Sequence, residues 1–164
     1  MAANGIVIRQ ATADDGDTLS ELDFRCWTPI AEVMPRPEKP RRPFFDDRLT
    51  PDQVLVAERD ATIVGWLALR PSTPVPSNRH VLQIQGLGVV PEARGAGIGM
   101  ALLETAADVA RSRGARKLTL RVLATNTPAQ RLYARAGYHT EGTLREEFLI
   151  ENQYVDDILM ARPL

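Results

Sequence analysis

The sequence predicts an α/β fold in which helices pack on a mixed, mostly antiparallel sheet. Strand-like runs alternate with helical segments along most of the 164 residues, and the chain ends in two strand-like runs joined by a short turn. Strands linked through helices tend to pair in parallel, whereas strands linked by tight turns pair antiparallel, so this order favours a sheet of both kinds. A chain of this length can bury a core of its own, and we expect one domain over residues 1–164.

The N-terminal part combines a short strand, a helix and an irregular segment. Gly5 to Arg9 is typical of an opening strand, and the carboxylates of Asp14 and Asp15 can cap a helix from about Asp17 to Phe24. Five prolines then lie between Cys26 and Pro51, so helix is allowed there only in short pieces.

Three strands are predicted next. Val54 to Glu58 and Thr62 to Leu69 are β-rich and are separated by three turn residues, which indicates an antiparallel hairpin. Val81 to Val90 follows and contains Gly86 and Gly88. Glycine inside a strand suggests a bulge or a close approach to the backbone.

A helix and a strand come after this run. Apolar residues at helical spacing extend from Ile98 to Arg113, and Gly114 supplies a left-handed end. Lys117 to Leu123 alternates well enough to be the fifth strand.

The C-terminal part begins with another helix. Thr127 is expected to cap it, with Pro128 at its first position and Gly137 at its close. Tyr138 to Ile150 and Tyr154 to Met160 are strand-like and predict a closing antiparallel hairpin.

Composition and charge exclude several classes of function. A formal net charge of -1 and a pI of about 6.1 argue against nucleic acid as the main partner. No apolar run approaches the roughly 20 residues needed to cross a bilayer, so no membrane partner is expected. A single cysteine, Cys26, excludes an internal disulfide, and without a signal-like start we expect a cytoplasmic protein. Two dispersed histidines and one cysteine provide no convincing metal site.

The most informative segment is the glycine-rich run from Arg94 to Gly99, which lies between a predicted strand and a predicted helix. Gly95, Gly97 and Gly99 lack a Cβ, so the chain can adopt unusual torsions and a ligand can approach the main chain. The first turn of the helix adds unpaired amide donors and the positive end of its dipole. The segment therefore predicts a site for phosphate or pyrophosphate.

Two common phosphate-binding motifs do not fit this segment. A Walker-type loop needs Lys and then Ser or Thr after the glycines, but Gly99 is followed by Met100 and Ala101. The dinucleotide fingerprint needs its third glycine where Met100 stands. A magnesium-dependent NTPase and a dinucleotide-binding oxidoreductase are therefore disfavoured.

The segment resembles the acetyl-CoA loop of the GCN5-related N-acetyltransferases, the GNAT family, whose pattern is Arg or Gln, two residues, Gly, one residue, then Gly or Ala. Arg94, Gly97 and Gly99 match it. The resemblance extends upstream to residues 87–91 and downstream to a second motif, an Asn, a helix carrying Leu-Tyr, and a Gly before an aromatic residue. The second motif is matched by Asn126, Ala129, Leu132, Tyr133, Gly137 and Tyr138.

The resemblance implies acetyl-CoA as cosubstrate, bound in a sheet that is split between its fourth and fifth strands. Backbone at Leu87, Gly88 and Val89 would pair with the pantetheine arm or polarise the thioester. Asn126 would hydrogen-bond the arm or order water, and Arg94 would contact phosphate. The amides expected to hold the pyrophosphate belong to Gly95, Ala96, Gly97, Ile98, Gly99 and Met100.

The same resemblance makes Tyr133 the candidate general acid, in contact with the cofactor. A phenol with an ordinary pKa near 10 is protonated at neutral pH and can donate to the departing sulfur; a ring that only packs is the alternative. The general base is open, because Gln83 and Gln85 stand where many members of the family carry a carboxylate. A water chain could replace it, or a carboxylate elsewhere in the chain. The carboxylates considered are Glu58, Glu146 and Glu147.

The function that the resemblance implies is acetyl transfer from acetyl-CoA to a primary amine by direct attack. Residues 142–145 and 154–160 are similar to amino-acid and phosphinothricin-type members, which favours a small-molecule acceptor. The alternative is a module that holds acyl-CoA as a sensor without turnover. The family also implies a possible homodimer. Residues 26–51 form either a surface loop or, as the family implies, a wall of the acceptor pocket.

Overall fold

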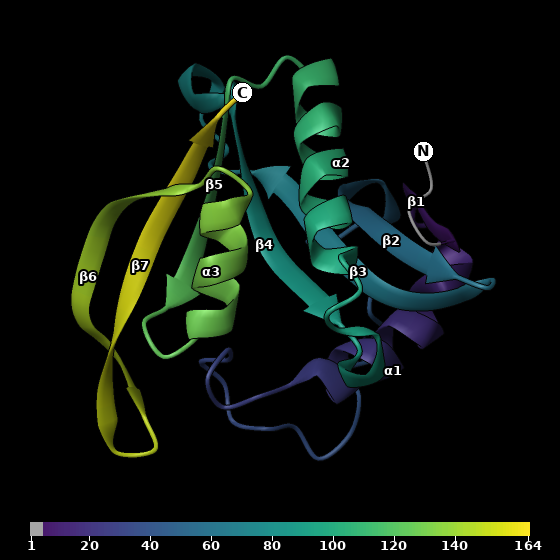
Figure 1. Ribbon diagram of the computed structural model, residues 1–164, viewed down its shortest axis with the longest axis horizontal. Helices are drawn as coiled ribbons and strands as arrows, with labels where there is room; N and C mark the ends of the chain where they lie inside the picture. The colour runs from purple at the N-terminus through teal and green to yellow at the C-terminus, as the bar shows by residue number, and fades with distance from the viewer. Residues whose placement is uncertain (1–4) are drawn as a thin grey trace.

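The computed structural model describes residues 5–164, so residues 1–4 of the expected domain lie outside the described part. Over residues 5–164 the chain forms a seven-stranded sheet in the order β1-β2-β3-β4-β5-β7-β6, together with three α-helices (Figure 1). The strands are β1 (Ile6–Gln10), β2 (Val54–Arg59), β3 (Thr62–Pro71), β4 (Val81–Val89), β5 (Lys117–Leu123), β6 (His139–Ile150) and β7 (Gln153–Pro163). The helices are α1 (Gly16–Cys26), α2 (Ile98–Ser112) and α3 (Thr127–Arg135).

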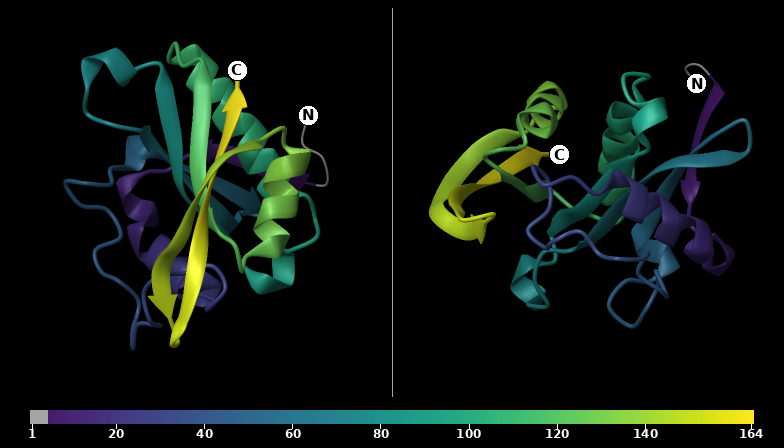
Figure 2. Two further views of the ribbon diagram at one scale, coloured as in Figure 1. Left: turned by 90° about the vertical axis from the view of Figure 1, so that its left-hand side faces the viewer. Right: turned by 90° about the horizontal axis from the view of Figure 1, so that it is seen from below.

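Neighbouring strands pair antiparallel except β4 and β5, which pair in parallel. Helix α2 joins these two strands and supplies the crossover that parallel pairing requires. Helices α2 and α3 lie on one face of the sheet and α1 lies on the other (Figure 2). The predicted α/β fold with a mixed, mostly antiparallel sheet is therefore confirmed.

Helix α2 places the main part of the core against the sheet. Ile98, Leu102 and Ala106, at the predicted helical spacing, are at most 1% exposed. Burying a side chain such as Leu102 stabilises the fold by about 1.5–3 kcal/mol. No helix within residues 5–164 is long and apolar enough to cross a membrane.

One predicted helix cap is wrong. The cap of α3 is Asn126, whose Oδ1 accepts a hydrogen bond from the Ala129 amide at 3.2 Å. Thr127 is instead the first residue of the helix. Asn is among the strongest capping residues, and Pro128 tolerates the second helical position because the first-turn amides have no partner inside the helix.

The irregular segment of residues 27–50 contains turns and one short bridge, in line with its prolines. Phe44 anchors it, because its ring is 3% exposed and packs edge-on against Trp66, with 5.3 Å between the ring centroids. The segment is thus held against the sheet close to β4.

The sheet is split between β4 and β5. Their pairing ends at Ile84 and Leu120, although β5 continues to Leu123 beside β7. On the other edge of β4 a register shift leaves Gln85 without a partner in β3, which is a β-bulge. A bulge bends a strand, so the separation of β4 from β5 has a local cause.

The two glycines of β4 make room for the indole of Trp66. A Cβ on Gly86 would fall 2.4 Å from Trp66 Cη2, and one on Gly88 would fall 2.8 Å from Trp66 Nε1. The predicted close approach in this strand is therefore made by a side chain of β3.

Replacing Gly86 with alanine is expected to lower the free energy of unfolding by about 1–3 kcal/mol, because the indole must leave its position. Chemical denaturation measures this change. The control is Gly142→Ala in β6, where the added Cβ would lie 3.7 Å from Leu159 Cδ1, an ordinary contact. If both variants lost the same free energy of unfolding, the cost would come from adding a methyl group to a strand and not from contact with Trp66.

Candidate functional site

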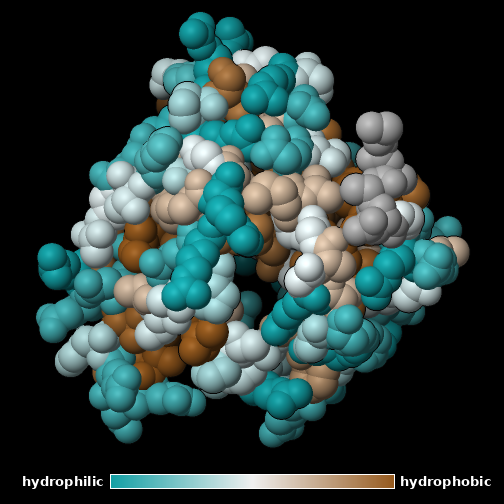
Figure 3. Space-filling model, in the orientation of Figure 1, coloured by the Kyte–Doolittle hydropathy of each residue, from teal (hydrophilic) through white to brown (hydrophobic). Residues whose placement is uncertain are grey.

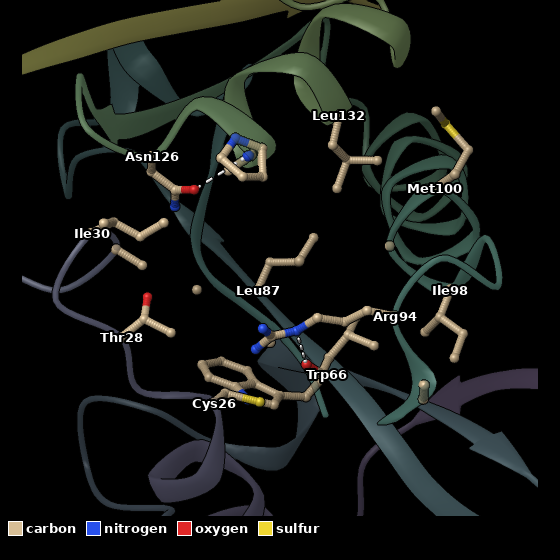
Figure 4. Close-up of a pocket in the computed structure, with 18 of the residues that line it drawn as sticks. Cys26, Thr28, Ile30, Trp66, Leu87, Arg94, Ile98, Met100, Asn126 and Leu132 are labelled. Atoms are coloured by element: carbon tan, nitrogen blue, oxygen red, sulfur yellow. Dashed lines mark hydrogen bonds between the residues drawn. The ribbon is translucent and has the colours of Figure 1, made fainter. Parts of the chain in front are cut away.

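A cavity of about 900 Å³ lies where β4 and β5 separate. Its walls come from α1 and the segment after it, from β4, from residues 94–99 with the start of α2, and from α3. Figure 3 shows the molecule hollowed near the centre of this face, and Figure 4 shows the side chains around the opening. We call this space the main cavity.

The glycine-rich segment forms one end of the main cavity. Gly95 and Gly97 have φ values of 78° and 82°, in the left-handed region that favours glycine. Gly97 caps α2, and the Ala101 amide donates to its carbonyl at 3.0 Å. The amides of residues 98–100 precede this bond and have no partner inside the helix, so they and the helix dipole can hold an anion.

Gly99 has a different role from the one expected. It lies inside α2 without the unusual torsion predicted for it, and its missing side chain lets α3 approach. A Cβ at this position would fall 2.9 Å from Leu132 Cδ2. Gly99 therefore sets the distance between the two helices that flank the cavity.

Arg94 extends into the main cavity from the same segment (Figure 4). Its Nε donates a hydrogen bond to the Val89 carbonyl at 3.0 Å, which ties the guanidinium to the end of β4. That bond does not use the two terminal nitrogens, Nη1 and Nη2. They are the atoms that an anion could contact.

A second cavity, of about 430 Å³, adjoins the main cavity. Both are lined by Glu32, Gln85, Leu87 and Asn126, and the outer wall of the smaller one comes from β5 and the hairpin β6–β7. We call this smaller space the side groove.

Tyr133 lines the side groove from α3. The residue is 8% exposed, and its hydroxyl makes no hydrogen bond within residues 5–164. Burial raises the pKa of Tyr133 to about 12, so the phenol keeps its proton at neutral pH. The site thus has an anion-binding end and a proton-bearing end.

Comparison with known proteins identifies the family. Residues 17–138 match the model of the Acetyltransferase (GNAT) family, which is well over half of the chain. The chain belongs to the GNAT family.

Several GNAT relatives are similar to this chain. A mycothiol acetyltransferase of Cellulomonas flavigena is 37% identical over 101 residues, which cover 58% of this chain and 28% of the relative. The N-acetyltransferase YhfO of Bacillus subtilis is 35% identical over 88 residues, 54% of this chain and 59% of the relative. The chain therefore spans less than two thirds of the length of these relatives.

Solved structures match over nearly the whole chain. The smu.2055 protein of Streptococcus mutans has a TM-score of 0.82 at 26% identity, over 96% of this chain and 98% of that one. The YncA protein of Salmonella typhimurium, solved with its cofactor acetyl-CoA, has a TM-score of 0.77 at 18% identity, over 97% and 94%. The second likeness bears on the fold alone.

Most of the residues predicted to bind the cofactor come together in the main cavity. Among them Ala96 and Tyr133 are the exceptions, because Ala96 lines neither cavity and Tyr133 lines the side groove. The residues found in the main cavity are Leu87, Gly88, Val89, Arg94, Gly95, Gly97, Ile98, Gly99, Met100 and Asn126.

Two carboxylates in this GNAT site were missed by the sequence reasoning. Asp23 and Glu32 line the main cavity, and burial raises the pKa of both. The charge of Asp23 raises the pKa of Glu32 further, although Glu32 is the more exposed residue. A signal existed for Asp23, because it follows the buried Leu19 by four residues and so shares the inward side of α1.

The carboxylates considered from the sequence lie elsewhere. Glu58 pairs with Arg9 at 2.6 Å, and Glu147 lies 3.5 Å from Arg121. Neither these two nor Glu146 lines either cavity. Of residues 26–51, by contrast, five line the main cavity, so that segment is more than a surface loop. They are Cys26, Thr28, Ile30, Ala31 and Glu32.

Cys26 also lines the main cavity of this GNAT chain, on the side of α1. Burial raises the pKa of its thiol to about 11, so the thiol stays protonated and is a poor nucleophile. Residues 5–164 contain no group of three or more His, Cys, Asp or Glu side chains placed to bind a metal ion.

Proposed function

We propose that this chain is an acetyl-CoA-dependent N-acetyltransferase that moves an acetyl group to a primary amine on a small molecule by direct attack. One observation carries the proposal. The split between β4 and β5 joins an anion-binding segment at one end to a buried, protonated phenol at the other. Membership of the GNAT family supports the same reaction class.

The anion-binding end fits the pyrophosphate of the coenzyme. The free amides of residues 98–100 converge at the positive end of α2, and Nη1 and Nη2 of Arg94 add a fixed positive charge. Gly95 and Gly97 carry no Cβ, and nothing lies within 4 Å of where one would be, so the approach to the main chain is open.

The split edge of β4 fits the amide-bearing arm of the coenzyme. Beyond Ile84 this edge has no strand partner within residues 5–164, so its backbone donors and acceptors can pair with an extended ligand. Leu87, Gly88 and Val89 line the main cavity along this edge. Asn126 uses Oδ1 to cap α3, which leaves its Nδ2 as a donor.

Direct attack requires a base for the amine and a proton donor for the sulfur. Acetyl-CoA, when bound, supplies the thioester carbonyl carbon, where a carbon–nitrogen bond forms as the carbon–sulfur bond breaks. Tyr133 donates its proton toward the departing sulfur, and Glu32 accepts the proton that the amine loses. Glu32 suits this role because it lines both cavities and its raised pKa makes it a stronger base.

The volume of the side groove favours a small acceptor. At about 430 Å³ it is within the range of small-molecule sites, roughly 300–1,000 Å³.

The proposal is tested by incubating the protein with acetyl-CoA and a panel of primary amines and following thiol release. We expect release with at least one small amine, together with a mass gain of one acetyl group on that amine. The result against the proposal is the absence of release with every amine.

Gln83 and Gln85, in place of a carboxylate on β4, favour a second candidate, a non-catalytic acyl-CoA sensor. In that case acetyl-CoA would raise the melting temperature of the protein although no amine is acetylated.

A further inference from the structure

The side groove has one buried charge that the reaction does not use. Asp157 of β7 lines the groove, and its side chain is only 3% exposed. Its hydrogen bonds come from Arg121 and end on Oδ2, whereas Oδ1 accepts none within residues 5–164. Because little water reaches this carboxylate, a positive group at Oδ1 would compensate for the solvation that the charge has lost.

Arg121 does not reverse the sign of the groove. Its guanidinium pairs with Asp157 and also lies 3.5 Å from Glu147. Two carboxylates therefore neutralise one guanidinium, and Glu32 adds another negative charge to the wall. The net charge of these groups is negative.

The groove also contains a second unpaired polar group and an apolar wall. The hydroxyl of Tyr133 is already assigned as the proton donor of the proposed reaction. Phe148 lines the side of the groove formed by β6. A ligand that fits all of these groups carries an ammonium ion on a short apolar or aliphatic body.

We propose that the acceptor is an amine that carries a second cationic group and no carboxylate beside an amino group. Asp157 Oδ1 receives the second cationic group, while the reacting amino group loses its proton to Glu32. The inference rests on the proposed function and narrows its substrate class. It excludes amino acids from the small-molecule acceptors that the similarity of residues 142–145 and 154–160 favoured.

The physical reason is the pairing of Arg121. An amino-acid acceptor would bring its own carboxylate next to Asp157, and the guanidinium of Arg121 in this groove is already shared by Asp157 and Glu147. Like charges brought together in a partly buried groove are strongly disfavoured. An amine that lacks the carboxylate avoids this repulsion and keeps the contact with Asp157.

The first test compares matched acceptors on the unmodified protein. Each pair differs only in a carboxylate: cadaverine with lysine, and agmatine with arginine. We expect kcat/KM to be at least about tenfold higher for the amine of each acetylated pair, because one unfavourable buried charge contact typically costs that much or more. Equal or higher values for the amino acids would overturn the inference.

The second test reverses the selectivity. Asp157→Asn removes the charge and releases Arg121, so kcat/KM should fall for the amines and rise for the amino acids. The control is Asp156→Asn, which removes the same charge from the neighbouring residue, outside the groove. An unchanged ratio in folded Asp157→Asn, or the same change in the control, would contradict the role of Asp157.

The outcomes separate the two proposals. Preferential acetylation of amino acids overturns this inference, but the proposed acetyltransferase function still holds. Failure to bind acetyl-CoA, or binding without acetylation of any amine, removes the proposed function and this inference with it. A melting curve would reveal whether Asp157→Asn folds. If it does not, the ratio of kcat/KM between amine and amino acid on the unmodified protein decides whether the inference holds.

Discussion

Replacing Tyr133 with phenylalanine is expected to lower kcat by about 10²-fold or more, the usual contribution of a positioned proton donor. The Kd for acetyl-CoA should stay the same, because the segment proposed to bind pyrophosphate lines the main cavity, whereas Tyr133 lines the side groove. Stability should change little, since the hydroxyl of Tyr133 makes no hydrogen bond within residues 5–164 that the substitution could break. Thiol release gives kcat, and calorimetry gives Kd.

The matched control is Tyr138→Phe. Tyr138 is the neighbouring tyrosine, with 6.0 Å between the ring centroids, and its hydroxyl is buried without a partner. Removing that hydroxyl should leave kcat unchanged. Equal turnover in Tyr133→Phe and the unmodified protein would eliminate Tyr133 as the proton donor.

The pH profile supplies an independent check on the same residue. Burial raises the pKa of Tyr133 to about 12, so the proton-bearing form persists as pH rises and is lost only near that value. Turnover should therefore not fall through this group below about pH 11. A loss of kcat near pH 9 that disappears in Tyr133→Phe would contradict the assigned pKa.

Replacing Gly97 with valine is expected to abolish measurable binding of acetyl-CoA. A β-branched residue at a φ of 82° is strained by about 1–3 kcal/mol, and relief of that strain moves the cap of α2. The amides that follow would then no longer converge on one anion. Isothermal titration with acetyl-CoA measures the effect.

Gly114→Val provides the comparison. Gly114 has a φ of 79° with nothing within 4 Å of an added Cβ, the same situation at the opposite end of α2. This variant should lose similar stability and retain its affinity for acetyl-CoA. Unchanged affinity in Gly97→Val would count against the anion site, and equal loss in both variants would assign the effect to general destabilisation.

Local patterns were sufficient for the order and type of the elements. The helical spacing from Ile98 and the paired runs around residues 59–61 predicted α2 and the β2–β3 hairpin, because backbone preference and apolar period agree there. The cap of α3 was assigned wrongly because Asn126 and Thr127 are both good capping residues. Which of the two accepts the bond depends on the torsions at the end of β5.

The candidate site divides in the same way. The sequence motifs predicted Gly95, Gly97 and Tyr133, because residues at a fixed spacing along a strand, a turn and a helix keep their relative positions in the fold. Asp23 and Glu32 were not predicted. The spacing of Asp23 from Leu19 indicates only the inward side of α1, and Glu32 belongs to a proline-rich segment without a regular pattern.

By itself the sequence determined the order of strands and helices, the family, and the glycine-rich turn before α2, since each follows from residues adjacent in the chain. The tertiary structure alone decided the rest. It set Gly99 against Leu132, gave Trp66 the space above Gly86, and placed the buried carboxylate of Asp157 in the wall of the side groove. These features depend on distances between segments far apart in the chain, where packing and desolvation, rather than local preference, fix the charge that a ligand meets.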